Sequence, residues 1–520
     1  MDSFNTIKRR TTDLFSSVPS SLPALPTLPS LPSIKNPLGS SHTMKGTWEK
    51  IKVPPLPRSL HTVDIVSGTV YIFGGETSGS SPDNDMHTVT LPSSGAQADY
   101  FAIKAKSASS GDTSPGSSVP SVVETPVDDE TEASKSLSSI SLSTPSASTT
   151  KGNSPIPDTK VPSPRVGHAT AVIGHRILLF GGRSPDSDGA SIDESGRVWI
   201  FDTRTSLWSH SDPVPDTMFP SPRYGHAAVA TEKPDTFSKP RSHHSRHPQS
   251  WQDWALGSSS EDRQEYGTPQ NPVVGTVAEK ATDLDADGYG TFIIAGGVTE
   301  EKETDEVWAF DVRGKTWQVL PSLGTAVVDP ALAISKSRLY AFTAGNKLEY
   351  LELVVDNFND KFSGGEEVVL SSRDGGWKTL GVVDENGGLP AQRQAAGLQA
   401  ITVGGGREYL VLMFGVGSGP NRQKYLDDVW VYQVPSQGMS IASATDTVLG
   451  VVGRKGEGRW TAVELGPEDD EDDASAEGPD GRAWIASATM GELEENGIVI
   501  WGGKGEGETV LGDGWILRLG

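Results

Sequence analysis

The sequence contains no cysteine among its 520 residues. Disulfides, thiolate metal sites, a cysteine nucleophile and any cofactor built on a cysteine side chain are therefore excluded. Hydrophobic residues are also scarce, at 35%, whereas the chain has 58 glycines and 36 prolines. A chain of this composition does not form one uniform core, so we expect part of it to be disordered.

Basic residues are in the minority, with 44 Lys and Arg against 68 Asp and Glu and a formal net charge of -24. A surface of this sign repels phosphate groups, so neither nucleic acid nor an anionic membrane is expected as the main partner. No apolar run approaches the ~20 residues of a membrane-spanning helix, and the N-terminus lacks the apolar core of a secretory signal. We expect a soluble protein of the cytoplasm or nucleus.

Three segments are rich in Ser, Pro and charged residues and poor in apolar ones, namely residues 1–45, 107–160 and 231–287. They cannot bury enough apolar surface to offset the entropy lost on folding. The sequence therefore predicts a disordered N-terminal arm (1–45) and one domain (46–520) with two long disordered insertions.

A short pattern repeats between these segments. In residues 290–321, an apolar run ends in a glycine pair, a second run follows, and a tryptophan comes after the next turn. Runs of four to six apolar residues between glycines and charged turns predict strands rather than helices. The pair recurs at positions 74/75, 181/182, 296/297 and 502/503, with eroded versions at Ala344-Gly345 and Gly415-Val416.

Six units of this kind can be traced, and the first and last complete each other. The final unit (482–520) lacks its tryptophan strand, whereas residues 47–53, TWEKIKV, form such a strand with no unit before it. The sequence therefore predicts a closed ring of six four-stranded blades, with the N-terminal strand pairing into the last blade.

The repeated elements are Arg-x-Gly-His, apolar-Gly-Gly, Val-Trp-x-Phe-Asp and a final Trp. This pattern resembles the kelch repeat, and the resemblance implies an all-β, six-bladed kelch-type β-propeller. Kelch propellers are mostly protein-interaction platforms, and a minority are enzymes. The copper site of galactose-oxidase relatives needs a cysteine crosslink, and the iron motif of the plant specifier proteins is incomplete here.

We therefore expect a scaffold or adaptor that binds a protein partner, with no cofactor, rather than an enzyme. The alternative is a small-ligand-binding or catalytic propeller of a specialised metabolic pathway. No feature of the sequence indicates the oligomeric state.

The candidate binding residues lie in the loops before the first strands. They are Arg58, Arg165, Arg223, Arg393 and Arg482, with His61, His168 and His226. Such loops gather at one end of a propeller's channel, where a ring of guanidinium groups would bind an acidic peptide or an anionic ligand. In the alternative interpretation, these residues belong to the repeat and bond between blades.

One candidate metal site stands out. Asp283, Asp285 and Asp287 have the Asp-x-Asp-x-Asp-Gly spacing of a calcium loop. The twelfth position, however, is Ile294 rather than an acid. An acidic turn leading into a strand is the alternative.

Overall fold

A computed structural model describes the part of the chain that forms the repeats. The described residues are 44–78, 82–91, 98–108, 160–185, 190–231, 290–300, 302–335, 337–343, 347–359, 366–372, 376–380, 388–403, 407–417, 424–435, 458–466 and 478–520. Almost all of the predicted arm and insertions, and the candidate calcium residues Asp283, Asp285 and Asp287, lie outside them.

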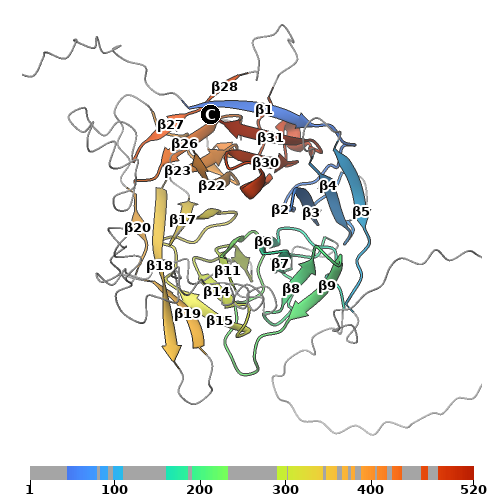
Figure 1. The fold of residues 1–520 in the computed structure, drawn as a ribbon, viewed down its shortest axis with the longest axis vertical. Coiled ribbons are helices and arrows are strands. Elements are labelled where there is room, and N and C mark those ends of the chain that lie inside the picture. Colours follow the sequence, from blue (N-terminus) through green and yellow to red (C-terminus); the bar gives the residue numbers. More distant parts are fainter. Residues whose placement is uncertain are drawn as a thin grey trace, which may run out of the picture. The chain divides into compact units, whose positions relative to one another are not determined.

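Most of the described strands form six largely antiparallel sheets that follow each other along the chain (Figure 1). Sheet 1 contains β2 (Thr62–Val66), β3 (Thr69–Phe73), β4 (Met86–Thr90) and β5 (Asp99–Ile103). Sheet 2 contains β6 (Ala169–Ile173), β7 (Arg176–Phe180), β8 (Val198–Asp202) and β9 (Leu207–Ser211). Sheet 3 contains β10 (Ala227–Thr231), β11 (Thr291–Ala295), β14 (Val307–Asp311) and β15 (Thr316–Leu320).

The other three sheets are less regular. Sheet 4 contains β16 (Ala331–Ser335), β17 (Arg338–Thr343), β18 (Lys347–Asn359), β19 (Glu366–Ser372) and β20 (Lys378–Thr379). Sheet 5 contains β22 (Gly397–Val403), β23 (Arg407–Met413), β26 (Val429–Gln433) and β27 (Trp460–Ala462). Sheet 6 contains β29 (Ala486–Thr489), β30 (Gly497–Trp501), β31 (Gly514–Leu519), β1 (Lys45–Ile51) and β28 (Glu464–Gly466).

Short elements occupy the connections between these strands. They are β12 (Val298–Thr299), β13 (Lys302–Glu303), β21 (Arg393–Gln394), β24 (Val416–Gly417), β25 (Lys424–Tyr425), and the 3-10 turns η2 (Gly491–Leu493) and η3 (Glu506–Glu508). No α-helix occurs among the described residues. The predicted all-β architecture of repeated antiparallel sheets is confirmed.

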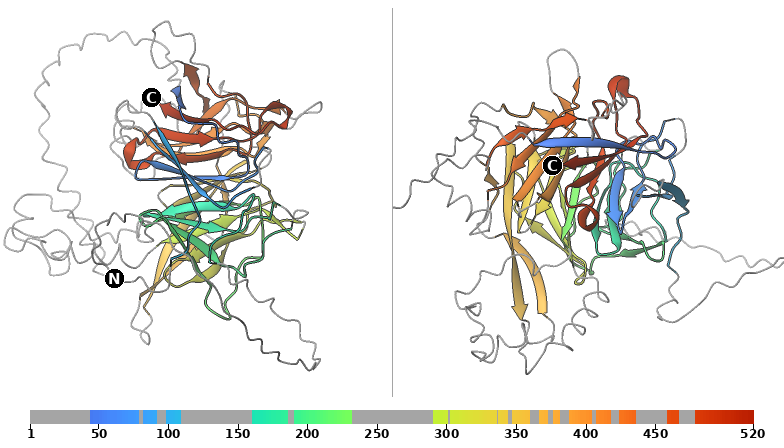
Figure 2. Two further views of the ribbon diagram at one scale, coloured as in Figure 1. Left: turned by 90° about the vertical axis from the view of Figure 1, so that its right-hand side faces the viewer. Right: turned by 45° about the horizontal axis from the view of Figure 1, so that its top comes forward.

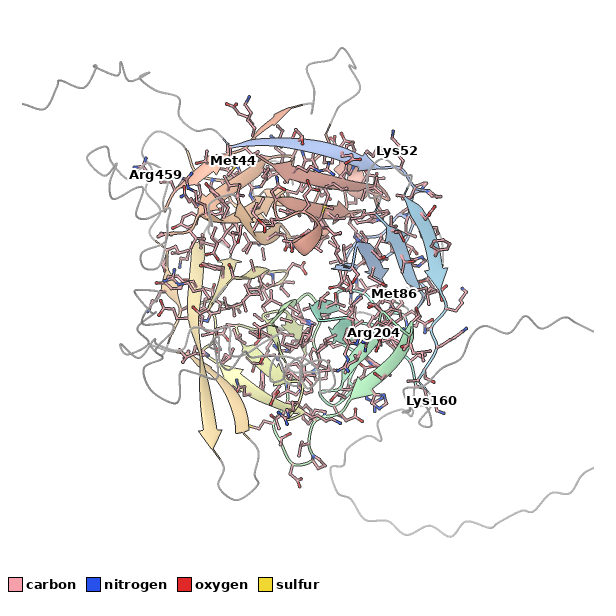
Figure 3. All side chains as sticks on the ribbon, viewed as in Figure 1. Met44, Lys52, Met86, Lys160, Arg204 and Arg459 are labelled. Carbon is pink, nitrogen blue, oxygen red and sulfur yellow. The ribbon has the colours of Figure 1, made fainter. Side chains whose placement is uncertain are left out.

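The core lies between successive sheets. The first strands contact one another in series: β2 with β6, β6 with β10, β10 with β16, β16 with β22, β22 with β29, and β29 with β2. Six clusters of buried apolar side chains each join two successive sheets, including sheets 6 and 1. Side chains fill the spaces between the sheets, whereas the labelled Lys52 and Lys160 lie at the periphery (Figure 3).

This packing explains the apolar runs in the sequence. All five residues of β11 and all five of β30 are buried, because neighbouring sheets cover both faces of these strands. The outermost strand of sheet 1, β5, has no buried residue. Continuous apolar runs therefore mark the inner strands, and mixed sequences mark the outer ones.

The glycine pairs do more than turn the chain. Gly74 and Gly75 have φ values of 63° and 90°. A Cβ atom on Gly74 would lie 2.6 Å from the carbonyl oxygen of Arg165 in sheet 2, and the Gly75 N–H donates to that oxygen at 2.9 Å. Equivalent bonds run from Gly182 to Arg223, Gly297 to Val327, Gly415 to Arg482 and Gly503 to Arg58. The missing side chains thus let neighbouring sheets meet backbone to backbone.

The eroded pair of sheet 5 was wrongly placed by one residue in the sequence analysis. The left-handed residues are Phe414 (φ 57°) and Gly415 (φ 103°), and Val416 begins β24. Phe414 occupies the first glycine position, and its buried ring lies 5.7 Å from the Trp48 ring. Ala344 and Gly345 lie outside the described residues.

Strand β1 pairs with the last sheet, as the sequence predicted. It pairs antiparallel with β31, with Gly46 opposite Leu519 and Ile51 opposite Gly514, and parallel with β28 on its other edge. In the right-hand view of Figure 2, β1 again lies beside the strands of sheet 6. The N-terminal strand is therefore an interior strand of this sheet.

Candidate functional site

The five repeat arginines lie inside the protein. Their exposed fractions are 0–2%. In sheet 2, Arg165 donates to the carbonyl oxygen of Gly181 at 2.9 Å and to both carboxylate oxygens of Glu194 at 2.9 and 3.0 Å. The corresponding ion pairs are Arg58–Asp83, Arg223–Glu306, Arg393–Asp428 and Arg482–Asp513.

A tryptophan completes this network in four sheets. The Trp199 indole N–H donates to Glu194 at 2.8 Å. The equivalent pairs are Trp308–Glu306, Trp430–Asp428 and Trp515–Asp513. In sheet 1, His87 takes this place, with its Nε2 atom 3.2 Å from Asp83. Burial alone would raise the pKa of Asp83, but His87 and Arg58 outweigh it and lower the pKa to about 2.

This geometry favours the interpretation in which the arginines belong to the repeat. A buried guanidinium group that is bonded to a carboxylate and a carbonyl of its own sheet presents no open face to an anion. An open ring of guanidinium groups is therefore not what the structure contains. The side chains concerned are Arg58, Arg165, Arg223, Arg393 and Arg482.

The three repeat histidines are also buried, and they pack against the glycine pair of the neighbouring sheet. A Cβ atom on Gly74 would lie 2.6 Å from the His168 ring, and one on Gly181 would lie 2.8 Å from the His226 ring. Burial, helped by the charge of the nearby arginine, lowers the pKa of His61 and of His226 to about 3. These histidines are therefore uncharged at neutral pH.

The residue two positions after each arginine takes a left-handed conformation. These residues form what we call the mouth ring: Leu60, Gly167, Gly225, Asp329, Ala395 and Trp484, with φ values of 48–65°. In sheet 4, Asp329 belongs to this ring although Val327 stands in the arginine position. Backbone hydrogen bonds of 2.7–3.5 Å link Leu60 to Trp484, Gly167 to Leu60, Gly225 to Gly167, Asp329 to Gly225 and Trp484 to Ala395.

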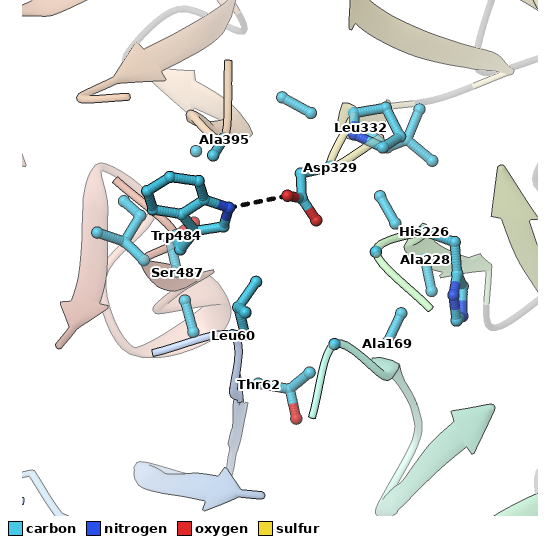
Figure 4. Close-up of a pocket in the computed structure, with 18 of the residues that line it drawn as sticks. Leu60, Thr62, Ala169, His226, Ala228, Asp329, Leu332, Ala395, Trp484 and Ser487 are labelled. Carbon is cyan, nitrogen blue, oxygen red and sulfur yellow. Dashed lines mark hydrogen bonds between the residues drawn. The ribbon is translucent and has the colours of Figure 1, made fainter. Parts of the chain in front are cut away.

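The mouth ring surrounds a cavity of about 190 Å³, which we call the central pocket. All six sheets contribute to its lining, and His61, His168 and His226 are among the lining residues. The Trp484 indole N–H donates to Asp329 Oδ2 at 2.8 Å across the pocket (Figure 4). Sequence reasoning missed this pair. Trp484 stands two residues after Arg482, but Asp329 follows Val327, so no repeat arginine marks its position.

A buried carboxyl, Asp64 on β2, bridges sheets 1 and 2. The Thr170 hydroxyl donates to Asp64 Oδ2 at 2.6 Å. Burial raises the pKa of Asp64 to about 7, although the bond from Thr170 lowers it. The folded state therefore binds a proton more readily than the unfolded state, whose pKa is ~3.9. The contribution of the Asp64 carboxyl to the free energy of unfolding is fully present below about pH 4 and is lost as the pH rises toward 7.

Replacing Asp64 with Asn is therefore expected to stabilise the protein at high pH. The amide keeps an acceptor for Thr170 and carries no charge, so the gain should grow from about zero near pH 4 to on the order of 3 kcal/mol near pH 8. Urea unfolding followed by tryptophan fluorescence would measure it. Asp99→Asn, on the exposed outer strand β5, is the matched control. An equal difference from the wild type at both pH values would contradict the expectation.

Within the described ranges, no group of three or more His, Asp and Glu side chains is arranged to hold a metal ion. The calcium hypothesis for Asp283, Asp285 and Asp287 remains a prediction, because those residues are not described. In the same ranges, no helix has the length and apolar character needed to cross a membrane.

Comparison with known proteins identifies one motif. A family model described as "Kelch motif" matches residues 164–215. The chain is 36% identical over 75 residues to the tRNA wybutosine-synthesizing protein 2/3/4 of Oryza sativa subsp. japonica, covering 14% of this chain and 6% of that protein. It is 26% identical over 200 residues to Tip elongation aberrant protein 1 of Schizosaccharomyces pombe, covering 37% and 12%.

The chain thus spans only a small part of these curated relatives. The solved structure of YjhT aligns with 90% of this chain and 99% of its own, at a TM-score of 0.45 and 12% identity. The matched kelch motif contains Arg165, the glycine pair at 181/182 and Glu194. The chain therefore carries a kelch motif in sheet 2, and similar elements recur in the other sheets.

Proposed function

We propose that this chain is a closed six-bladed kelch propeller that acts as a scaffold and binds a protein partner through the loops around the central pocket. Three observations support closure. The first strands contact one another in a cyclic series, β1 of the N-terminal segment pairs with β31, and Gly503 of sheet 6 donates to Arg58 of sheet 1. Closure covers the sheet faces and leaves only short outer edges exposed.

The mouth ring is the observation that carries the binding role. Its backbone is held by hydrogen bonds between sheets, yet its side chains range from none at Gly167 and Gly225 to the indole of Trp484. A fixed backbone frame with varied side chains suits recognition, because the surface is ordered before the partner arrives. The repeat arginines support this frame from inside and are not expected to contact the partner, whereas the repeat histidines line the central pocket.

Site-specific crosslinking would test the role. A photoreactive amino acid at Gln394, which is exposed and adjacent to Ala395 of the mouth ring, should crosslink a discrete protein in an extract of the source cells. Excess unmodified protein should compete the product away. The same amino acid at Val319, which is 53% exposed on the outer strand β15, is the control. Equal products at both positions, or none at Gln394, would count against the proposal.

A further inference from the structure

The central pocket contains a carboxylate with one oxygen available. Asp329 Oδ2 accepts the Trp484 indole N–H. Oδ1 lies beside Gly225, where a Cβ atom would approach it to 3.0 Å. In Figure 4 the carboxylate points into the pocket, away from the wall of sheet 4. The glycine at the neighbouring ring position therefore leaves space next to the acid.

No cationic side chain of the protein compensates this acid within the described residues. The residues that line the pocket include neither Lys nor Arg, and the lining histidines have lowered pKa values. Burial raises the pKa of Asp329 to about 6, although the bond from Trp484 lowers it. A partly buried carboxylate without a counter-ion is costly, and a cation entering the pocket would relieve that cost.

The size of the pocket limits what can enter. A cavity of about 190 Å³ is smaller than the ~300–1,000 Å³ of pockets that hold drug-sized ligands. It has room for the end of one side chain. The net charge of -24 attracts cations to the protein from a distance. The hydroxyl groups of Thr62 and Ser487 and the indole ring of Trp484 also line the pocket.

We propose that the central pocket binds the cationic end of an Arg or Lys side chain of the protein partner, with Asp329 as its counter-ion. Trp484 positions the carboxylate through its indole N–H, and the small ring residues Gly167, Gly225 and Ala395 leave the path of approach open. This inference rests on the proposed scaffold function and names the chemistry that the scaffold recognises.

Fluorine NMR of the full chain labelled with 5-fluorotryptophan would test it. The Trp484 resonance is assigned by its loss in Trp484→Phe. The probes are N-acetyl-arginine-N-methylamide, its lysine counterpart and the neutral citrulline counterpart. The two cationic probes should shift the Trp484 signal saturably, and citrulline should bind at least about tenfold more weakly. An equal response to citrulline would overturn the inference.

The Asp329→Asn variant provides a second test of the cation site. Asparagine tolerates the left-handed conformation and keeps an acceptor for the indole, so the fold should survive. Affinity for the cationic probes should fall at least about tenfold in this variant and remain unchanged in the control Asp99→Asn. Unchanged affinity in Asp329→Asn would overturn the proposal. If this variant does not fold, the citrulline comparison still decides.

The two proposals can fail separately. Crosslinked partner at Gln394 without any response to cationic probes would refute the cation site and leave the scaffold role intact. Saturable binding of the cationic probes without a crosslinked partner would support the cation site. It would refute the proposal that a protein partner supplies the cation. Ethylammonium, added as a third cationic probe, represents a free amine. If it binds more tightly than the capped amino acids, a side chain is not the ligand of this pocket.

Discussion

Deletion of residues 1–51 is expected to abolish the cooperative unfolding transition, and a separate peptide with the sequence of residues 44–53 is expected to restore it. Strand β1 has both edges occupied, and its register with β31 spans six residue pairs. Each net hydrogen bond contributes about 0.5–1.5 kcal/mol, and burying Ile51 adds about 1.5–3 kcal/mol. The total is comparable to the about 5–15 kcal/mol that stabilises a typical protein.

Urea titration with circular dichroism and tryptophan fluorescence would measure this effect with and without the peptide. A scrambled peptide of the same composition is the control, since it offers the same side chains without the register. Two results would refute the role given to β1. One is a truncated chain that unfolds at the urea midpoint of the full chain, and the other is equal rescue by both peptides.

Arg165→Ala is expected to lower the free energy of unfolding by about 3–5 kcal/mol, because it leaves the carboxylate of Glu194 partly buried without its partner. Arg165→Lys should recover little of this loss, since an ammonium group cannot reproduce the forked contact with both carboxylate oxygens. Urea unfolding with an unchanged slope would measure both variants.

The matched control is Arg204→Ala in the same sheet. Its side chain is 62% exposed and 4.0 Å from Asp202, so the free energy of unfolding should change by less than about 0.5 kcal/mol. This pair of variants separates the two interpretations of the repeat arginines. If Arg165 served only to bind a ligand, Arg165→Ala would leave the free energy of unfolding unchanged. That result would contradict the structural role and make Arg165 a candidate binding residue again.

The strands and their order could be predicted because their signals are local. The apolar run of β11 and the glycines after it stand next to each other in the sequence, and burial between two sheets requires that pattern. The pairing of β1 with β31 was also predictable, because the last repeat lacks one strand and the N-terminus supplies it. Prediction from local signals failed at Phe414, where a phenylalanine stands in the position of the first glycine and the pair was therefore placed one residue too late.

The partners of the arginines were not predicted, because their offset from the arginine varies, from 29 residues for Glu194 to 83 for Glu306. In three sheets the acid stands two residues before the tryptophan, but sheet 2 departs from this spacing. Glu306 stands two residues before Trp308, whereas Glu194 stands five residues before Trp199. In sequence, an acid of this kind looks like any exposed acid in a loop. Only the folded sheet shows that this acid neutralises a buried guanidinium group. The repeat arginines therefore stabilise the fold and do not form the binding surface.

By itself, the sequence determined a kelch-type, all-β repeat with its first strand placed in its last sheet, because hydrophobic periodicity and glycine turns are short-range properties of the chain. Only the tertiary structure decided which charges are free. The five repeat arginines form ion pairs with acids of their own sheets. Asp329 and Trp484, which are 155 residues apart in the sequence, meet in the central pocket. This contact joins sheet 4 to sheet 6 and depends on how the sheets pack around the pocket, which the spacing of residues along the chain does not specify.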